Sequence, residues 1–252
     1  MHFYSPSDLE QLPQDLPYLT ETIKWVENFL GKSHPDLGRP GLVCPFVPRA
    51  LKLNTIRLAV VQAKNLQQAQ IEAIVKQYRE RFLELAPQQG ERAFYKALMI
   101  VFPDVSPEEA TMLVDGIQQK LKPFFVEEGL MLGEFHQLNE SPGLHNPHFR
   151  PLRSPIPMLA IRYMTESDLP FLDRLTDEPQ VRVRYLEAYL KRISADIKDA
   201  KKLNHAQTAL ALAQAQLEQG KLESSSQARR CPFAPLIEFF RAAKKALERI
   251  SK

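Results

Sequence analysis

Apolar residues recur with two different periods in the first two thirds of the chain. Short apolar runs of four to eight residues are typical of buried strands, and spacings of three and four are typical of helices. Runs of the first kind occupy residues 56–61, 97–102, 130–135 and 157–164. Helical spacing fills 66–85 and 106–121 between them. The order is therefore β-α-β-α-β-β.

Residues that start and stop helices support this order. Asn65 is a suitable N-cap for the first long helix. Ser106 precedes Pro107 and two glutamates, which is a strong helix start. We expect that helix to end near Leu121, because Pro123 follows.

The two ends of the chain differ from the middle. Residues 1–15 are expected to form a loose arm, and 16–30 a helix that Gly31 ends. After 176 the sequence predicts helices over 180–202, 204–220 and 235–250, with a flexible joint at the serines 224–226. We expect an arm and helix (1–33), a core domain (34–175) and a C-terminal helical extension (176–252).

These elements predict an α+β (or α/β) fold, in which a small mixed four-stranded sheet is covered by helices. A chain of 252 residues with 44% hydrophobic and 25% charged residues is typical of a soluble globular protein. The formal net charge of +3 is too small to indicate a nucleic-acid partner. No run approaches the ~20 apolar residues of a membrane helix. The first residues do not resemble a signal peptide, so we expect a cytoplasmic protein without membrane insertion.

The densest polar segment is GEFHQLNESPGLHNPHFRPLRSPIP, at residues 133–157. Long loops inside compact cores are often functional. In an extended strand Glu134 and His136 share one face, so they could act as a base and its orienting group, or as two metal ligands. A hydrogen-bonded structural histidine is the alternative. His145 and His148 are expected in a surface turn.

Two arginines lie within this segment and a third follows it. Arg150, Arg153 and Arg162 could converge as a clamp for a carboxylate or another anion, since guanidinium groups suit such ligands. A solvated basic surface is the equally supported alternative.

Two near-identical phrases contain both cysteines: CPFVP from Cys44 and CPFAP from Cys231. A thiolate can ligate haem iron, and Phe46 could pack on a porphyrin. A buried, inert cysteine is the alternative. A disulfide stays open, although a reducing compartment disfavours it. Cys231 precedes the last predicted helix, so we expect it at a helix-entry corner. The usual P-loop, dinucleotide-binding, hydrolase-elbow and zinc-protease motifs do not occur.

The phrases HPDLGRPGLVCPFVPRAL and GLMLGEFHQLNESPGLHNPHFRPLRSPIPMLAIRYMTESDLPFL resemble a bacterial domain family of unknown function, over about residues 34–174. A fainter resemblance is to bacterial haem-dependent N-oxygenases. It lies in residues 43–46, 56–58 and 98–102, and in His136 with Asn146, Pro147 and Arg150. It implies a haem with His136 as first and Cys44 as second choice of iron ligand.

The leading expectation is a haem-binding oxidative enzyme acting on a small amine- or carboxylate-bearing substrate. Arg150 and Arg153 would hold haem propionates or the substrate carboxylate. One alternative is a non-enzymatic protein whose C-terminal helices bind a partner or form a homodimer, through Val183, Leu186, Leu190, Ile193 and Ile197. Another is a cofactor-free hydrolase or isomerase using Glu134 and His136.

Overall fold

The computed structural model describes residues 2–9, 16–86, 89–194, 197 and 199–229, with side chains up to residue 222. Its four strands form one mixed sheet in the order β1-β2-β4-β3. The strands are β1 (Ile56–Val60), β2 (Ala97–Val101), β3 (Leu130–Phe135) and β4 (Met158–Tyr163). β1 and β2 are parallel, and β4 is antiparallel to both of its neighbours. The predicted fold class is confirmed.

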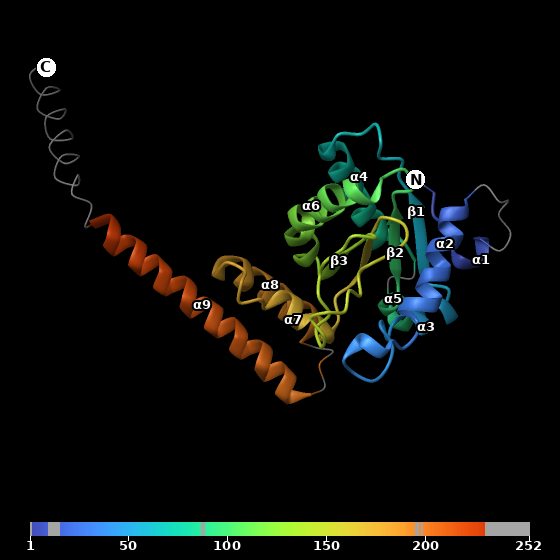
Figure 1. Cartoon of the computed structure of the whole chain (residues 1–252). Coiled ribbons are helices and arrows are strands. Elements are labelled where there is room, and N and C mark those ends of the chain that lie inside the picture. Colours follow the sequence, from blue (N-terminus) through green and yellow to red (C-terminus); the bar gives the residue numbers. More distant parts are fainter. Residues whose placement is uncertain (1, 10–15, 87–88, 195–196, 198, 230–252) are drawn as a thin grey trace, which may run out of the picture. The chain divides into compact units, whose positions relative to one another are not determined.

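The two long crossover helices, α4 (Gln68–Glu84) and α6 (Pro107–Val126), cover one face of this sheet (Figure 1). α4 and α5 (Gly90–Phe94) join β1 to β2, and α6 joins β2 to β3. The buried core on this face includes Ile71, Phe82, Ile117 and Phe125, with Leu132 of the sheet beneath them. Apolar residues three and four apart on α4 and α6 are thus buried against the sheet, as their spacing predicts.

The opposite face is covered by elements that precede β1 (Figure 1). These are α2 (Pro17–Trp25), the π-helix η1 (Val26–Leu30) and α3 (Val47–Lys52). The helix predicted over 16–30 is confirmed, and its last five residues form the π-helix. The sequence missed α3, in which Pro48 lies in the first turn. It also missed α1 (Pro6–Leu9), η2 (Pro35–Leu37) and the short α5.

Several predicted helix boundaries were wrong, among them the end predicted at 202, because α8 (Pro179–Ile193) ends nine residues earlier. α4 starts at Gln68, and its capping box is made by Gln67 and Gln70 rather than by Asn65. α6 continues through Pro123 to Val126. Phe125 and Val126 are fully buried, and their burial offsets the hydrogen bond lost at the proline. The capping box of Ser106 with Glu109 is as predicted.

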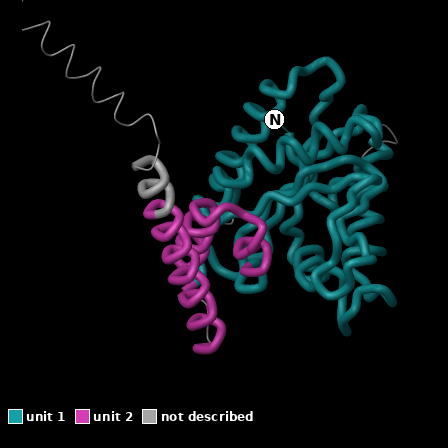
Figure 2. The backbone as a smooth tube through the Cα atoms, turned by 60° about the vertical axis from the view of Figure 1, so that its left-hand side comes forward, with its two compact units in different colours: residues 1–168, 191–193 teal, residues 169–190, 194–252 magenta. Residues whose placement is uncertain are grey.

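The chain divides into two compact units (Figure 2). Unit 1 comprises residues 1–168 and 191–193, and unit 2 comprises 169–190 and 194–252. Unit 2 contains α7 (Leu169–Leu172), most of α8 (Pro179–Ile193) and α9 (Ala200–Arg229), whereas the turn η3 (Glu166–Asp168) ends the first part of unit 1. None of the described helices is long and apolar enough to cross a membrane.

Within unit 2, α8 and α9 pack through small and branched side chains. Leu186 is fully buried with Ala209 and Ala213, and Val183 packs against the same cluster. Part of the face predicted to bind a partner is therefore covered by the chain itself. The predicted joint at serines 224–226 was wrong, because α9 stays helical through them. Cys231 and the helix predicted over 235–250 lie outside the described residues.

Candidate active site

His136 follows directly after β3, at the carboxyl edge of the sheet. β1, β2 and β3 all run in one direction, so their carboxyl ends meet at this edge. Open sheets commonly place ligand sites at such edges. Alternation along β3 puts Leu132, Glu134 and His136 on the face covered by α6. The backbone thus directs the imidazole of His136 toward α6.

The His136 ring is fully buried and lies against a carboxylate. Its Nε2 atom is 3.0 Å from Oδ1 of Asp115 on α6, whose side chain is 27% exposed. The Nδ1 atom is also buried and has no hydrogen-bond partner. A carboxylate only accepts, so Nε2 carries the proton in this pair. In the neutral ring, Nδ1 is then the nitrogen with the lone pair.

The backbone around His136 is fixed by the loop that follows it. The N–H of His136 donates to the carbonyl of Leu152 at 3.3 Å. Its own carbonyl accepts from the N–H groups of Asn139 at 3.2 Å and Ser154 at 3.3 Å. The loop therefore leaves the sheet at His136 and returns beside it, so both ends of the loop position the imidazole.

Asp115 is the partner of His136 that sequence reasoning missed. The predicted orienting group was Glu134, which lies half-buried on β3, two residues before His136. The carboxylate at the ring comes instead from α6, 21 residues earlier in the chain. One signal was present: aspartate is unfavourable inside a helix, and Asp115 lies next to the buried Val114.

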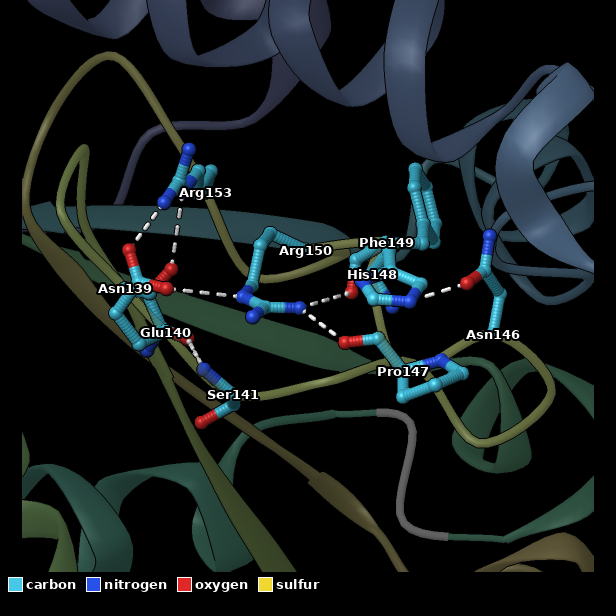
Figure 3. Close-up of polar contacts among 9 residues, drawn as sticks. All are labelled: Asn139, Glu140, Ser141, Asn146, Pro147, His148, Phe149, Arg150 and Arg153. Carbon is cyan, nitrogen blue, oxygen red and sulfur yellow. Dashed lines mark hydrogen bonds and ion pairs between the residues drawn. The ribbon is translucent and has the colours of Figure 1, made fainter.

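Arg150 and Arg153 both contact one carboxylate, that of Glu140 (Figure 3). The Nε of Arg150 donates to Glu140 Oε2 at 3.0 Å, and the guanidinium of Arg153 contacts Oε1. Arg153 also donates to the carbonyl of Asn139 at 3.1 Å. The hydrogen bonds from Arg150 and Arg153 lower the pKa of Glu140. These arginines thus tie the two limbs of the loop together.

The remaining loop histidines lie in a turn at the surface. His145 and His148 are exposed. Asn146 organises this turn: its side chain accepts from the N–H of His148 at 2.9 Å and donates to the carbonyl of Asp36 at 2.8 Å. Among the residues that the structure describes, no three His, Cys, Asp or Glu side chains are grouped to hold a metal ion.

Arg162 belongs to a different part of the sheet. It pairs in register with Met131 near the start of β3, whereas His136 follows the end of that strand. Both terminal nitrogens of Arg162 donate to the buried Asp168, at 2.6 and 2.7 Å. The three arginines therefore do not form one clamp, since Arg150 and Arg153 share another carboxylate, Glu140.

Cys44 lies on the face of the sheet opposite to His136. It is half-buried and free, and it packs with the core cluster that contains Met158 and Val101. The ring of Phe46 packs against that of Phe94, with the two ring centroids 5.6 Å apart.

The side chains predicted to hold haem therefore do not face one another: that of His136 contacts Asp115, those of Arg150 and Arg153 contact Glu140, and Cys44 lies on the other face of the sheet. As a set they do not fit one haem. Ligation by His136 alone or by Cys44 alone stays a prediction.

The comparisons with known proteins give one match. A family model described as a domain of unknown function, DUF6875, matches residues 19–204. No curated protein and no solved structure matches the chain. The predicted resemblance to an uncharacterised domain family agrees with this match, which begins earlier and ends later than expected, and nothing in the comparisons points to N-oxygenases. Because the match covers well over half of the chain, the protein belongs to the DUF6875 family.

Proposed function

We propose that the protein is a cofactor-free enzyme, an isomerase or hydrolase of small molecules, in which His136 transfers the proton. The observation that carries this proposal is the buried imidazole with a carboxylate on Nε2 and no partner on Nδ1. Nδ1 is the general base, and Asp115 is the group that orients it. This is a version of the predicted base-and-orienter pair with Asp115 in place of Glu134.

The unpartnered nitrogen supports a chemical role. Leaving a buried polar atom without a hydrogen bond costs about 1–3 kcal/mol, so such atoms are rare in native proteins. Proton transfer needs a nitrogen with a vacant lone pair. Asp115 fixes the ring in the tautomer that keeps Nδ1 unprotonated, and its negative charge stabilises the imidazolium that forms when Nδ1 accepts a proton.

Substrate access requires movement of the loop that follows His136. The ring is fully buried, and the segment 139–154 returns to its backbone. The contacts that hold this segment, between Glu140 and the two arginines, are partly solvent-exposed. They can therefore open without unfolding the sheet. Once the loop is open, Nδ1 can abstract a proton from a carbon next to a carbonyl group, or from a water molecule.

The test is proton exchange into small molecules in D2O, followed by NMR. The panel contains 2-oxo acids, amino acids and esters, and each is incubated with wild type, His136→Gln, Asp115→Asn and His148→Gln. We expect exchange or hydrolysis of one class, lost in His136→Gln, strongly reduced in Asp115→Asn and unchanged in His148→Gln. Turnover that persists in His136→Gln, or a panel that wild type leaves unchanged, contradicts the proposal.

Haem binding at His136 is the second candidate function, and the unpartnered Nδ1 atom favours it as well. Histidines that ligate metals usually donate their other ring N–H to a carboxylate, as His136 does to Asp115. Haem would supply oxidative chemistry. Arg150 and Arg153, which were predicted to assist it, are bonded to Glu140, so this candidate rests on Nδ1 alone. A haemin titration separates it from the first proposal.

A further inference from the structure

The second face of the sheet is incompletely covered over β3 and β4. β4 lies between β2 and β3, so side chains on both of its faces are expected to be buried. Ala160 on β4 is nevertheless only half-buried, and so is Gly133, its direct partner on β3. Solvent therefore reaches the middle of the sheet at two positions that have almost no side chain.

Aromatic rings border this uncovered area. Trp25, at the end of α2, lies edge-on to Phe135, with the ring centroids 5.6 Å apart. It is stacked on Phe29, with the ring centroids 5.8 Å apart. All three rings are half-buried. A Cβ atom on Gly133 would meet the ring of Phe135 at 3.1 Å, so this ring leans over the glycine. The three rings and the small-residue floor offer flat apolar surface, which suits a planar ligand.

A guanidinium group, ion-paired with the buried Asp168, lies at one side of the same area. Arg162 is two residues after Ala160 on the same face of β4, and its side chain is 33% exposed. Burial opposes the charge, but the hydrogen bonds and charge of Asp168, with a smaller contribution from Cys44, outweigh it and raise the pKa of Arg162. Both terminal nitrogens of Arg162 donate to Asp168, and one of them also donates to the carbonyl of Tyr163 at 3.0 Å, whereas its Nε makes none of the described hydrogen bonds.

We propose that this area, here named the Ala160 face and made of Gly133, Ala160, Trp25, Phe135 and Arg162, binds a flat, mainly apolar molecule that carries a carboxylate. The ring system lies on Ala160 and contacts the rings of Trp25 and Phe135, the second of which covers Gly133. The carboxylate lies toward Arg162. This site is on the opposite side of the sheet from His136, so it is independent of the proposed proton transfer.

The chain provides its own reporter, because Trp25 is its single tryptophan. Wild type is titrated with 1-pyrenebutyrate and with its uncharged methyl ester, and the fluorescence of Trp25 is recorded. The variants are Ala160→Leu, which fills the floor, and Arg162→Met, which removes the charge. Ala215→Leu on the exposed surface of α9 is the matched control.

We expect saturable quenching of Trp25 in wild type and in Ala215→Leu. Ala160→Leu should weaken binding of both probes at least tenfold. Arg162→Met should weaken binding of the acid but not of the ester. Quenching that does not saturate, or equal affinities in wild type and Ala160→Leu, overturns the site, and equal binding of acid and ester by wild type overturns the role of Arg162.

A measurement on wild type alone guards against misfolded variants. With 13C-labelled alanine methyl groups, saturating 1-pyrenebutyrate should shift the Ala160 resonance strongly through the ring current of the pyrene. Resonances of Ala209 and Ala213 in unit 2 serve as the internal reference. An Ala160 signal that stays in place at saturation overturns the proposal whatever the variants do.

Discussion

The Nε2 atom of His136 lies 3.0 Å from Oδ1 of Asp115, and the other ring nitrogen has no partner. His136 directly follows β3, and Asp115 lies in α6, the helix that leads to β3. Packing of α6 on β3 therefore brings the carboxylate to the imidazole. A fully buried ring that uses only one of its two nitrogens forgoes a hydrogen bond, and this is the observation on which the proposed proton transfer rests.

Replacing Asp115 by alanine should destabilise unit 1. The substitution leaves the buried Nε2–H of His136 without its acceptor, which costs about 1–3 kcal/mol. Urea denaturation followed by far-UV circular dichroism measures the change in the free energy of unfolding. Glu108→Ala provides the control, because Glu108 is an exposed acid on the same helix. Equal stability of Asp115→Ala and wild type would show that the contact is not maintained in solution.

Replacing Glu140 by glutamine should loosen the loop without unfolding the sheet. Glu140 is exposed and holds both Arg150 and Arg153 (Figure 3). We expect amide hydrogen exchange in residues 139–153 to accelerate a few-fold, since exposed ion pairs contribute little individually. Glu84→Gln, which removes an exposed pair with Arg81, is the control. Unchanged exchange in the loop would show that the arginines do not hold it.

The ion pairs of Glu140 with Arg150 and Arg153 should weaken at acid pH. The pKa of Glu140 is lowered in the folded protein by its hydrogen bonds to Arg150 and Arg153. Its stabilising contribution is therefore complete above the ordinary glutamate value of 4.5 and is lost as the pH falls through the lower folded value. Loop exchange, corrected for intrinsic rates, should rise in that range in wild type and not in Glu140→Gln. An equal rise in both would assign the effect to other carboxylates.

The sequence was sufficient for the four strands and the helices between them, but not for the strand order, because apolar runs and helical spacings are local signals. It was insufficient for contacts between distant elements. Ser106 and Glu109 cap α6 as expected, since a capping box involves residues three apart. The pairing of Asp115 with His136 depends on how α6 lies on β3, which no local pattern encodes.

The loop at 133–157 and Cys44 illustrate the same limit. The sequence identified 133–157 as polar and proline-rich, but not that Arg150 and Arg153 would meet on Glu140 instead of facing a ligand. It placed Cys44 in a loop, although α3 starts only three residues later. Whether Cys44 faced His136 could not be derived, because opposite faces of a sheet are set by which helices cover each side.

Lys96 should make the stability of unit 1 depend on alkaline pH. Its side chain is buried, and its Nζ donates to the carbonyls of Phe82 at 2.8 Å and Leu85 at 2.6 Å. Burial lowers the pKa of Lys96 from 10.5 to about 8. Between these values the unfolded chain binds more protons than the folded one, so the free energy of unfolding should rise with pH.

The measurement compares wild type with Lys96→Met between pH 7 and pH 10. Relative to that variant, wild type should gain about 2 kcal/mol across the interval. Lys52→Met, an exposed lysine on α3, should behave as wild type. Parallel pH profiles of wild type and Lys96→Met would mean that the two carbonyl groups keep the ammonium protonated.

Replacing Asp173 by asparagine should unfold unit 2 selectively. Arg182 is almost completely buried, and it donates to Asp173 at 2.6 Å and to Gln216 at 2.6 Å. Removing one partner of a buried ion pair costs about 3–5 kcal/mol. We expect faster hydrogen exchange in α8 and α9 but not in the sheet, and no change in Asp177→Asn. Slow exchange retained in Asp173→Asn would show that Gln216 alone holds Arg182.

Haemin titration decides between the two functional proposals. Absorption spectra are recorded for wild type, His136→Ala and Cys44→Ala at increasing haemin. The cofactor-free proposal predicts no Soret band that depends on His136. A band that His136→Ala abolishes and Cys44→Ala retains would favour iron ligation at Nδ1 instead. Loss of the Soret band in Cys44→Ala alone would indicate that haem binds on the opposite face of the sheet.

The most direct test of the central claim is the protonation of the His136 ring. Two-bond 15N–1H correlation NMR of protein labelled in its histidines distinguishes the two neutral tautomers, and the His136→Gln spectrum assigns the signal. The account predicts that Nε2 carries the proton and Nδ1 does not, and that Asp115→Ala relaxes this preference. A proton on Nδ1 in the neutral ring of wild type would contradict the account, because His136 would then have no base to offer.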